Sequence, residues 1–278
     1  MFSSFFEMLS YPFMLRAIFV GILIAACAAL LGVSLVLKRY SMIGDGLSHV
    51  GFGALAISIA MNAAPLALSI PIVVIAAFLL LRLSERSKIK GDAAIALIST
   101  SSMAIGVTAV SLTTGMNIDI YNYMFGSILA MSKGDVVLSI LLAIVVLFLY
   151  VVFYTKIFAV TFDENFAKAT GTKSGAYNML IAFLTAITIV LGMRLMGALL
   201  ISSLIIFPSL TSMRIFKSFK KVAISSVIIS VVCFIIGITI SFVYSTPAGA
   251  SIVIINIIAF LGFWITSYIK IFANKERA

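Results

Sequence analysis

Long apolar segments recur along this whole chain, and they restrict its possible folds more than any other feature. A helix needs about 20 predominantly apolar residues to cross a bilayer. Hydrophobic residues make up 63% of the sequence and charged residues only 10%, and a soluble domain of this size cannot bury so much apolar surface. The candidate spans lie near residues 13–36, 43–61, 64–82, 92–113, 135–155, 176–193, 195–213, 222–244 and 248–269. We therefore expect an all-α polytopic transmembrane bundle of about eight or nine spanning helices, forming a single domain over residues 1–278.

The distribution of basic residues predicts how the bundle is oriented. The chain has 19 Lys and Arg residues. If the loop at Lys38 is cytoplasmic, alternation of the spans leaves only Arg16, Lys133 and Arg194 outside, so 19 less 3 gives 16 inside. Cytoplasmic loops of membrane proteins are enriched in Lys and Arg. The prediction is an outer N-terminus and a cytoplasmic C-terminus, and the net charge of +10 indicates topology rather than binding to nucleic acid.

A carboxylate and an imidazole enter the membrane together at the start of the second apolar segment. Asp45 precedes His49, the only histidine of the chain, by four residues, and this spacing puts both side chains on one face of a helix. Ionisable groups inside a membrane are costly, about 3 kcal/mol for Asp, and usually line a pathway. Oxygen and imidazole nitrogen are ligands for zinc, manganese or iron. In the alternative interpretation, Asp45 caps the helix and His49 satisfies it.

Two ligands are too few for a metal site, but a two-fold dimer would supply a second pair around its axis. The sequence does not distinguish between the three metals.

Pro208 lies inside a later apolar segment, where it removes a backbone hydrogen bond. It is a candidate for shaping the pore, and packing alone is the alternative.

The longest polar stretch lies on the predicted cytoplasmic side, at about residues 156–175. Within it, residues 162–171 have the pattern of a short amphipathic helix that ends at Gly171. Asp163 and Glu164 suit the positive N-terminus of such a helix. A helix of this kind can dock a cytoplasmic partner, and a solvated loop is the alternative.

Several classes of enzyme are excluded by what the sequence lacks. It contains no phosphate-binding loop of the G-x-x-x-x-G-K-[ST] type, so ATP hydrolysis would need a separate subunit. The single histidine leaves no Ser/His/Asp set for hydrolysis. Cys27 and Cys233 lie in apolar runs and have no metal-binding spacing. A non-enzymatic transporter is expected, and an ion-coupled secondary transporter for a cation is the alternative, although such proteins usually have internal repeats and several buried ionisable groups.

Seven short segments, in this order, resemble the membrane-spanning permease subunit of bacterial zinc, manganese and iron ABC importers. The most specific is Gly44-Asp45-Gly46-Leu47-Ser48-His49, which resembles the G-D-x-x-S-H motif of that family. The other six are residues 14–17, the stretch from Gly32 to Arg39, residues 123–129, the stretch with Phe162, Asp163, Glu164, Ala167 and Gly171, residues 197–200 with Pro208, and residues 247–250.

The resemblance implies a mechanism as well as a fold. It implies that two permeases, copies or relatives, form a pore in the bacterial inner membrane. Each would dock on a cytoplasmic ATP-binding subunit, and an extracytoplasmic protein would deliver the metal. By the match, Asp45 and His49 bind the ion in the translocation path, and residues 162–171, including Ala167, couple to the ATPase. The transported ion would be the substrate, and no permanently bound cofactor is expected.

Overall fold

The computed structural model describes residues 7–61, 63–86, 91–112 and 133–275, and every regular element in them is a helix. The predicted all-α class is therefore confirmed. The resembling segment at residues 123–129 lies outside the described residues.

Nine long helices account for most of the described chain, and each overlaps one predicted span. They are α2 (Pro12–Leu37), α3 (Met42–Ala60), α4 (Pro65–Arg86), α5 (Gly91–Leu112), α7 (Lys133–Val152), α10 (Ser174–Met196), α11 (Ala198–Ile215), α12 (Phe219–Tyr244) and α13 (Ala248–Lys275). Within the described residues, seven are long and apolar enough to cross a membrane, namely all but α3 and α5. Two short helices, α8 (Tyr154–Phe162) and α9 (Glu164–Ala169), connect α7 to α10.

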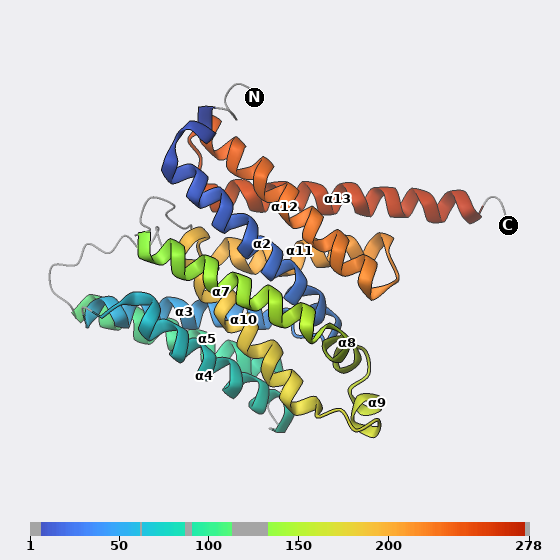
Figure 1. The fold of residues 1–278 in the computed structure, drawn as a ribbon, viewed down its shortest axis with the longest axis horizontal. Coiled ribbons are helices and arrows are strands. Elements are labelled where there is room, and N and C mark those ends of the chain that lie inside the picture. The colour runs from blue at the N-terminus through green and yellow to red at the C-terminus, as the bar shows by residue number, and fades with distance from the viewer. Residues whose placement is uncertain (1–6, 62, 87–90, 113–132, 276–278) are drawn as a thin grey trace.

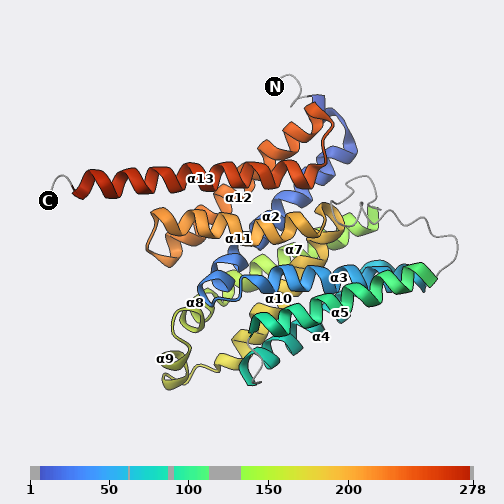
Figure 2. The same ribbon diagram turned by 180° about the vertical axis from the view of Figure 1, so that it is seen from behind.

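The long helices form two groups with a central layer between them (Figures 1 and 2). Helices α3, α4 and α5 pack together on one side, and α11, α12 and α13 pack together on the other. Helix α10 contacts both groups. Helix α2 packs against α11 and α12 of the second group and against α10, and α7 packs against α2. Large apolar side chains such as Phe148, Ile228 and Ile254 are exposed on the outside. An apolar exterior is expected where the surrounding solvent is lipid.

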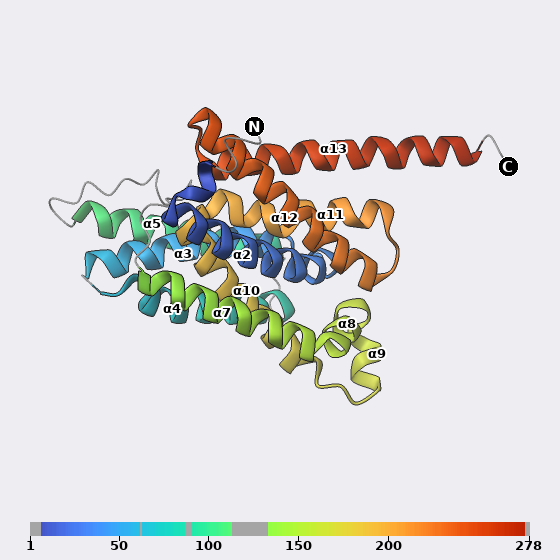
Figure 3. The ribbon, with the colours of Figure 1, turned by 45° about the horizontal axis from the view of Figure 1, so that its top comes forward.

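Helices α8 and α9 lie beyond the end of α7, at the same end of the molecule as the C-terminus (Figures 1 and 3). The polar stretch predicted at about residues 156–175 therefore folds into structure of its own. Helix α8 buries Ile157 and Val160, so it is attached to the bundle rather than solvated on all sides.

Glycines bring the backbones of α3 and α5 into direct contact. A Cβ atom on Gly53 would lie 2.4 Å from the carbonyl oxygen of Ser102, and one on Gly106 would lie 2.7 Å from the Cα atom of Gly53. Small residues at such positions let membrane helices approach closely. The helix that carries Asp45 and His49 is therefore fixed against α5 by backbone packing.

A single residue, Gly197, connects α10 to α11. Its backbone has φ 84° and ψ 163°, a conformation that only glycine adopts readily. The span expected at residues 176–193 extends further than predicted, to Met196. Arg194, which the topology prediction put on the outer side, therefore belongs to the last turn of α10, and its guanidinium lies 2.7 Å from Asp135 at the start of α7.

Candidate functional site

The site of Asp45 and His49 begins with a tight corner between α2 and α3. Arg39 has the left-handed φ of 61°, and the N–H of Tyr40 donates to the carbonyl of Leu35 at 2.8 Å. This is the hydrogen bond of a Schellman helix end. Helix α3 begins at Met42, so Asp45 lies in its first turn.

The predicted pairing of Asp45 and His49 on one helix face is confirmed. The Nε2 atom of His49 lies 3.7 Å from Oδ2 of Asp45, which is an ion-pair distance rather than a hydrogen bond. The side chains are 32% exposed for His49 and 48% exposed for Asp45, so an ion can reach both. The N-cap alternative does not fit the position, because the helix starts three residues before Asp45.

Helix α11 adds a hydroxyl group to this site. The Oγ atom of Ser202 lies 3.4 Å from Oδ1 of Asp45 and also 3.1 Å from the carbonyl oxygen of Ala198. The hydroxyl of Ser48 donates to the backbone carbonyl of Asp45 at 2.7 Å. The prediction from sequence missed Ser202, because a serine in an apolar helix carries no local signal of its partner.

One chain does not complete a metal site from these groups. Among the described residues, no cluster of three or more His, Cys, Asp or Glu side chains could hold a metal ion. Each chain offers one carboxylate and one imidazole, with the Ser202 hydroxyl beside them. Pro208 lies within the same helix as Ser202 and is buried. It is therefore placed to affect the shape of α11, the helix that faces Asp45.

The predicted cytoplasmic helix is present, but it starts later than expected. Phe162 ends α8, and Asp163 has an extended backbone that separates α8 from α9. The Oδ1 atom of Asp163 accepts a hydrogen bond from the N–H of Phe166 at 2.9 Å, so Asp163 is the N-cap of α9. Phe162 and Phe166 are 76% and 66% exposed, whereas Ala167 is buried.

Gly171 ends this segment as the sequence predicted. Its φ is 81°, its N–H donates to the carbonyl of Lys168 at 3.0 Å, and the N–H of Thr172 donates to the carbonyl of Ala167 at 2.9 Å. Glycine is the usual residue at such a left-handed helix end. The six residues of α9 are thus held at both ends by specific hydrogen bonds.

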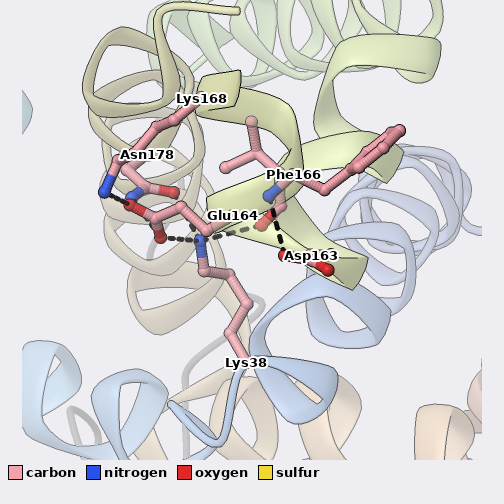
Figure 4. Close-up of polar contacts among 7 residues, drawn as sticks. Lys38, Asp163, Glu164, Phe166, Lys168 and Asn178 are labelled. Atoms are coloured by element: carbon pink, nitrogen blue, oxygen red, sulfur yellow. Dashed lines mark hydrogen bonds and ion pairs between the residues drawn. The ribbon is translucent and has the colours of Figure 1, made fainter. Parts of the chain in front are cut away.

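A partly buried polar cluster attaches α9 to the bundle (Figure 4). We call it the Lys38 cluster, and its members are Lys38, Val160, Glu164, Lys168 and Asn178. The Nζ atom of Lys38 lies 3.3 Å from Oε2 of Glu164, and it donates to the carbonyl of Val160 at 3.3 Å and to the Oδ1 atom of Asn178. Asn178 donates to Oε2 of Glu164 at 3.1 Å, and Lys168 lies 2.8 Å from Oε1.

The cluster changes the acidity of Glu164. Burial alone would raise the pKa of its carboxyl, but the three polar side chains around it outweigh burial and lower that pKa to about 2. The Lys38 side chain is only 9% exposed, compared with 29% for Glu164. No sequence pattern predicted that Lys38 and Asn178 would contact Glu164, so the cluster is a finding of the structure.

Comparisons with known proteins place the chain in a family. Residues 10–267 match the ABC 3 transport family. The high-affinity zinc uptake system membrane protein ZnuB of Haemophilus influenzae is 28% identical over 90% of this chain and 96% of its own. The manganese import system permease protein ScaB of Streptococcus gordonii is also 28% identical, over 90% of each chain.

A solved structure shares the fold at full length. A chain of PsaBC from Streptococcus pneumoniae in complex with Fab superposes with a TM-score of 0.85 and 26% identity, covering 95% of both chains. The resemblance to permease subunits of metal ABC importers, inferred from seven short segments, is thereby confirmed at the level of the family. This chain belongs to the ABC 3 transport family.

Proposed function

We propose that this chain is the membrane-spanning permease subunit of an ATP-driven importer for a divalent transition metal. The observation that carries the proposal is the family match over residues 10–267, together with relatives named for zinc and manganese uptake across nearly their whole length. Manganese and zinc are the favoured substrates. Iron remains a candidate substrate only because the seven sequence segments resemble a family whose members also import iron.

The metal ion would pass between two permease chains at the pair Asp45 and His49. Two chains around an axis would bring two carboxylates and two imidazoles to one ion, with no thiolate among them. Such a set suits manganese or zinc but lacks the soft ligands of permanent zinc sites. The partly exposed side chains of Asp45 and His49 would be accessible to the ion, and weak binding would allow release.

The proposed orientation places α8 and α9 in the cytoplasm and the N-terminus outside, with α3 and α5 crossing the membrane in addition to the seven apolar helices. The bias of basic residues supports it. A reporter active only outside the cytoplasm should be silent when fused after Ala278 and active when inserted near Thr246. The reverse pattern would contradict the orientation.

A cytoplasmic ATP-binding subunit is the proposed partner of α8 and α9, and an extracytoplasmic metal-binding protein is the proposed partner on the other side. Phe162 and Phe166 project from this region with most of their surface exposed. Exposed aromatic side chains are typical anchors of protein interfaces. The N-cap Asp163 and the helix end at Gly171 support the backbone that presents them.

The test of the proposal is metal uptake by the assembled transporter, measured in parallel for manganese, zinc and iron and divided by the amount of complex. Asp45→Asn keeps the shape of the side chain and removes its charge, and His49→Ala removes the imidazole. Each should reduce uptake to background at normal expression, whereas Glu7→Gln, a neutralised carboxylate on the exposed N-terminal segment, should leave it unchanged. Normal uptake by Asp45→Asn would refute the proposed path.

The energy source separates this function from its alternative. Uptake into vesicles should require ATP and the ATP-binding subunit. Uptake that follows an imposed proton or sodium gradient, without ATP, would instead establish an ion-coupled secondary transporter.

A further inference from the structure

The corner between α2 and α3 is a stiff connection from Lys38 to Asp45. Lys38 is the C-cap residue of α2, and its N–H donates to the carbonyl of Ser34 at 3.1 Å. The bond from Tyr40 to Leu35 closes the turn, and α3 starts two residues after Tyr40. Because the turn is short and internally hydrogen-bonded, a displacement of Lys38 must move the first turn of α3 as well.

The side chain of Lys38 leaves this corner and binds three other helices. It contacts the carbonyl of Val160 on α8, the carboxylate of Glu164 on α9 and the amide oxygen of Asn178 on α10. Asn178 is 5% exposed, so the ammonium group sits among acceptors with little water around it. Removing one partner of a partly buried ion pair leaves the other charge poorly compensated, so these contacts hold the helices together.

Glu164 is the member of the cluster that belongs to the proposed coupling segment. It occupies the first position of α9, next to the N-cap Asp163. One oxygen of Glu164 binds Lys38 and Asn178 inside the protein, and the other binds Lys168, which is 57% exposed. A force applied to α9 from the cytoplasm therefore reaches the α2–α3 corner through the partly buried pair of Lys38 and Glu164.

We propose that Lys38 is a positioning residue that links α9 to the pair Asp45 and His49, so that movement of the coupling segment changes the metal site. The inference rests on the proposed function, because it describes how movement of α9 would reach the metal site of the same importer. Lys38 touches neither ligand. It acts through the rigid corner at one end and the Glu164 carboxylate at the other.

The experiment uses the reconstituted complex with its ATP-binding subunit and measures metal transported per ATP hydrolysed, with the metal that the wild type transports. Lys38→Met keeps the length of the side chain and removes its charge. It should lower the ratio at least about tenfold while ATP hydrolysis stays within about twofold of wild type, because the ATPase would work on a segment detached from α3. Lys220→Met, the same change on the exposed start of α12, should leave the ratio unchanged.

A double variant tests the pairing itself. Glu164→Gln removes the opposite charge and should also lower the ratio. The double variant Lys38→Met/Glu164→Gln should be no worse than Lys38→Met alone, because both changes break one link. An unchanged ratio in Lys38→Met, or effects of the two changes that multiply, would overturn the proposal. If Lys38→Met fails to assemble, Glu164→Gln alone decides by the same ratio.

Hydrogen exchange separates failure of the link from failure of the proposed function. Backbone amides of residues 41–45 should exchange faster in Lys38→Met than in wild type, and equally fast in Lys220→Met and wild type. This readout requires no transport. If the wild type transports no metal, the proposed function fails, and unaltered exchange in Lys38→Met would overturn the link independently.

Discussion

Replacing Gly53 with alanine would insert a methyl group between α3 and α5. Its Cβ atom would lie 2.4 Å from the carbonyl oxygen of Ser102, and ordinary contact begins at 3.4 Å, so the helices must separate by about 1 Å. The opposing atoms belong to the backbone and cannot turn away. Overpacking of this kind costs about 3 kcal/mol, and alanine regains about 1 kcal/mol over glycine in a helix. The net loss of about 2 kcal/mol corresponds to a factor of about 30 in the unfolding equilibrium.

The loss can be measured by titrating the detergent-solubilised protein with a denaturing detergent and following its helical circular dichroism. Gly262→Ala is the matched control, because Gly262 lies inside α13 and an added Cβ meets nothing within 4 Å. The control should be as stable as wild type or more stable by up to about 1 kcal/mol. If Gly53→Ala and Gly262→Ala unfold at the same concentration of denaturing detergent, the backbones of α3 and α5 do not make the close contact at Gly53.

Three further outcomes follow from the ends of the bundle. The pKa of Glu164 is lowered from 4.5 to about 2, so the ionised carboxylate stabilises the fold fully above pH 4.5 and loses this effect as the pH falls towards 2. The difference in unfolding free energy between wild type and Glu164→Gln should therefore be largest above pH 4.5 and shrink as the pH falls towards 2. Gly171→Val places a β-branched residue at φ 81°, costing about 1–2 kcal/mol, and should weaken co-purification with the ATP-binding subunit while membrane insertion stays normal. Asp135→Asn breaks the 2.7 Å pair with Arg194 and should destabilise the protein by about 3 kcal/mol in the same detergent titration, whereas the double variant Asp135→Asn/Arg194→Gln should lose less.

Hydropathy predicted the helices well because burial in lipid depends on composition over about 20 residues and little on distant contacts. Polar or short helices give a weaker hydropathy signal. Helix α3 carries Asp45, His49 and several glycines, and it is not among the seven clearly apolar spans. The break at Asp163 was also missed, although an Asp directly before an acidic residue such as Glu164 is a recognisable start of a helix.

The site was predictable only where its partners are close in sequence. The contact between Asp45 and His49 follows from helical spacing alone. Ser202 is 157 residues from Asp45, and Glu164 is 126 residues from Lys38, so both contacts depend on how separate helices pack. No local pattern distinguishes these side chains from other serines and lysines in similar surroundings.

The one-residue connection at Gly197 also constrains how the protein is made. One residue spans at most about 3.6 Å, which is far less than the width of a helix. The C-terminal end of α10 and the N-terminal end of α11 therefore stay adjacent at every stage of membrane insertion. Once both helices have formed, they can rearrange in the lipid only by rotating about Gly197.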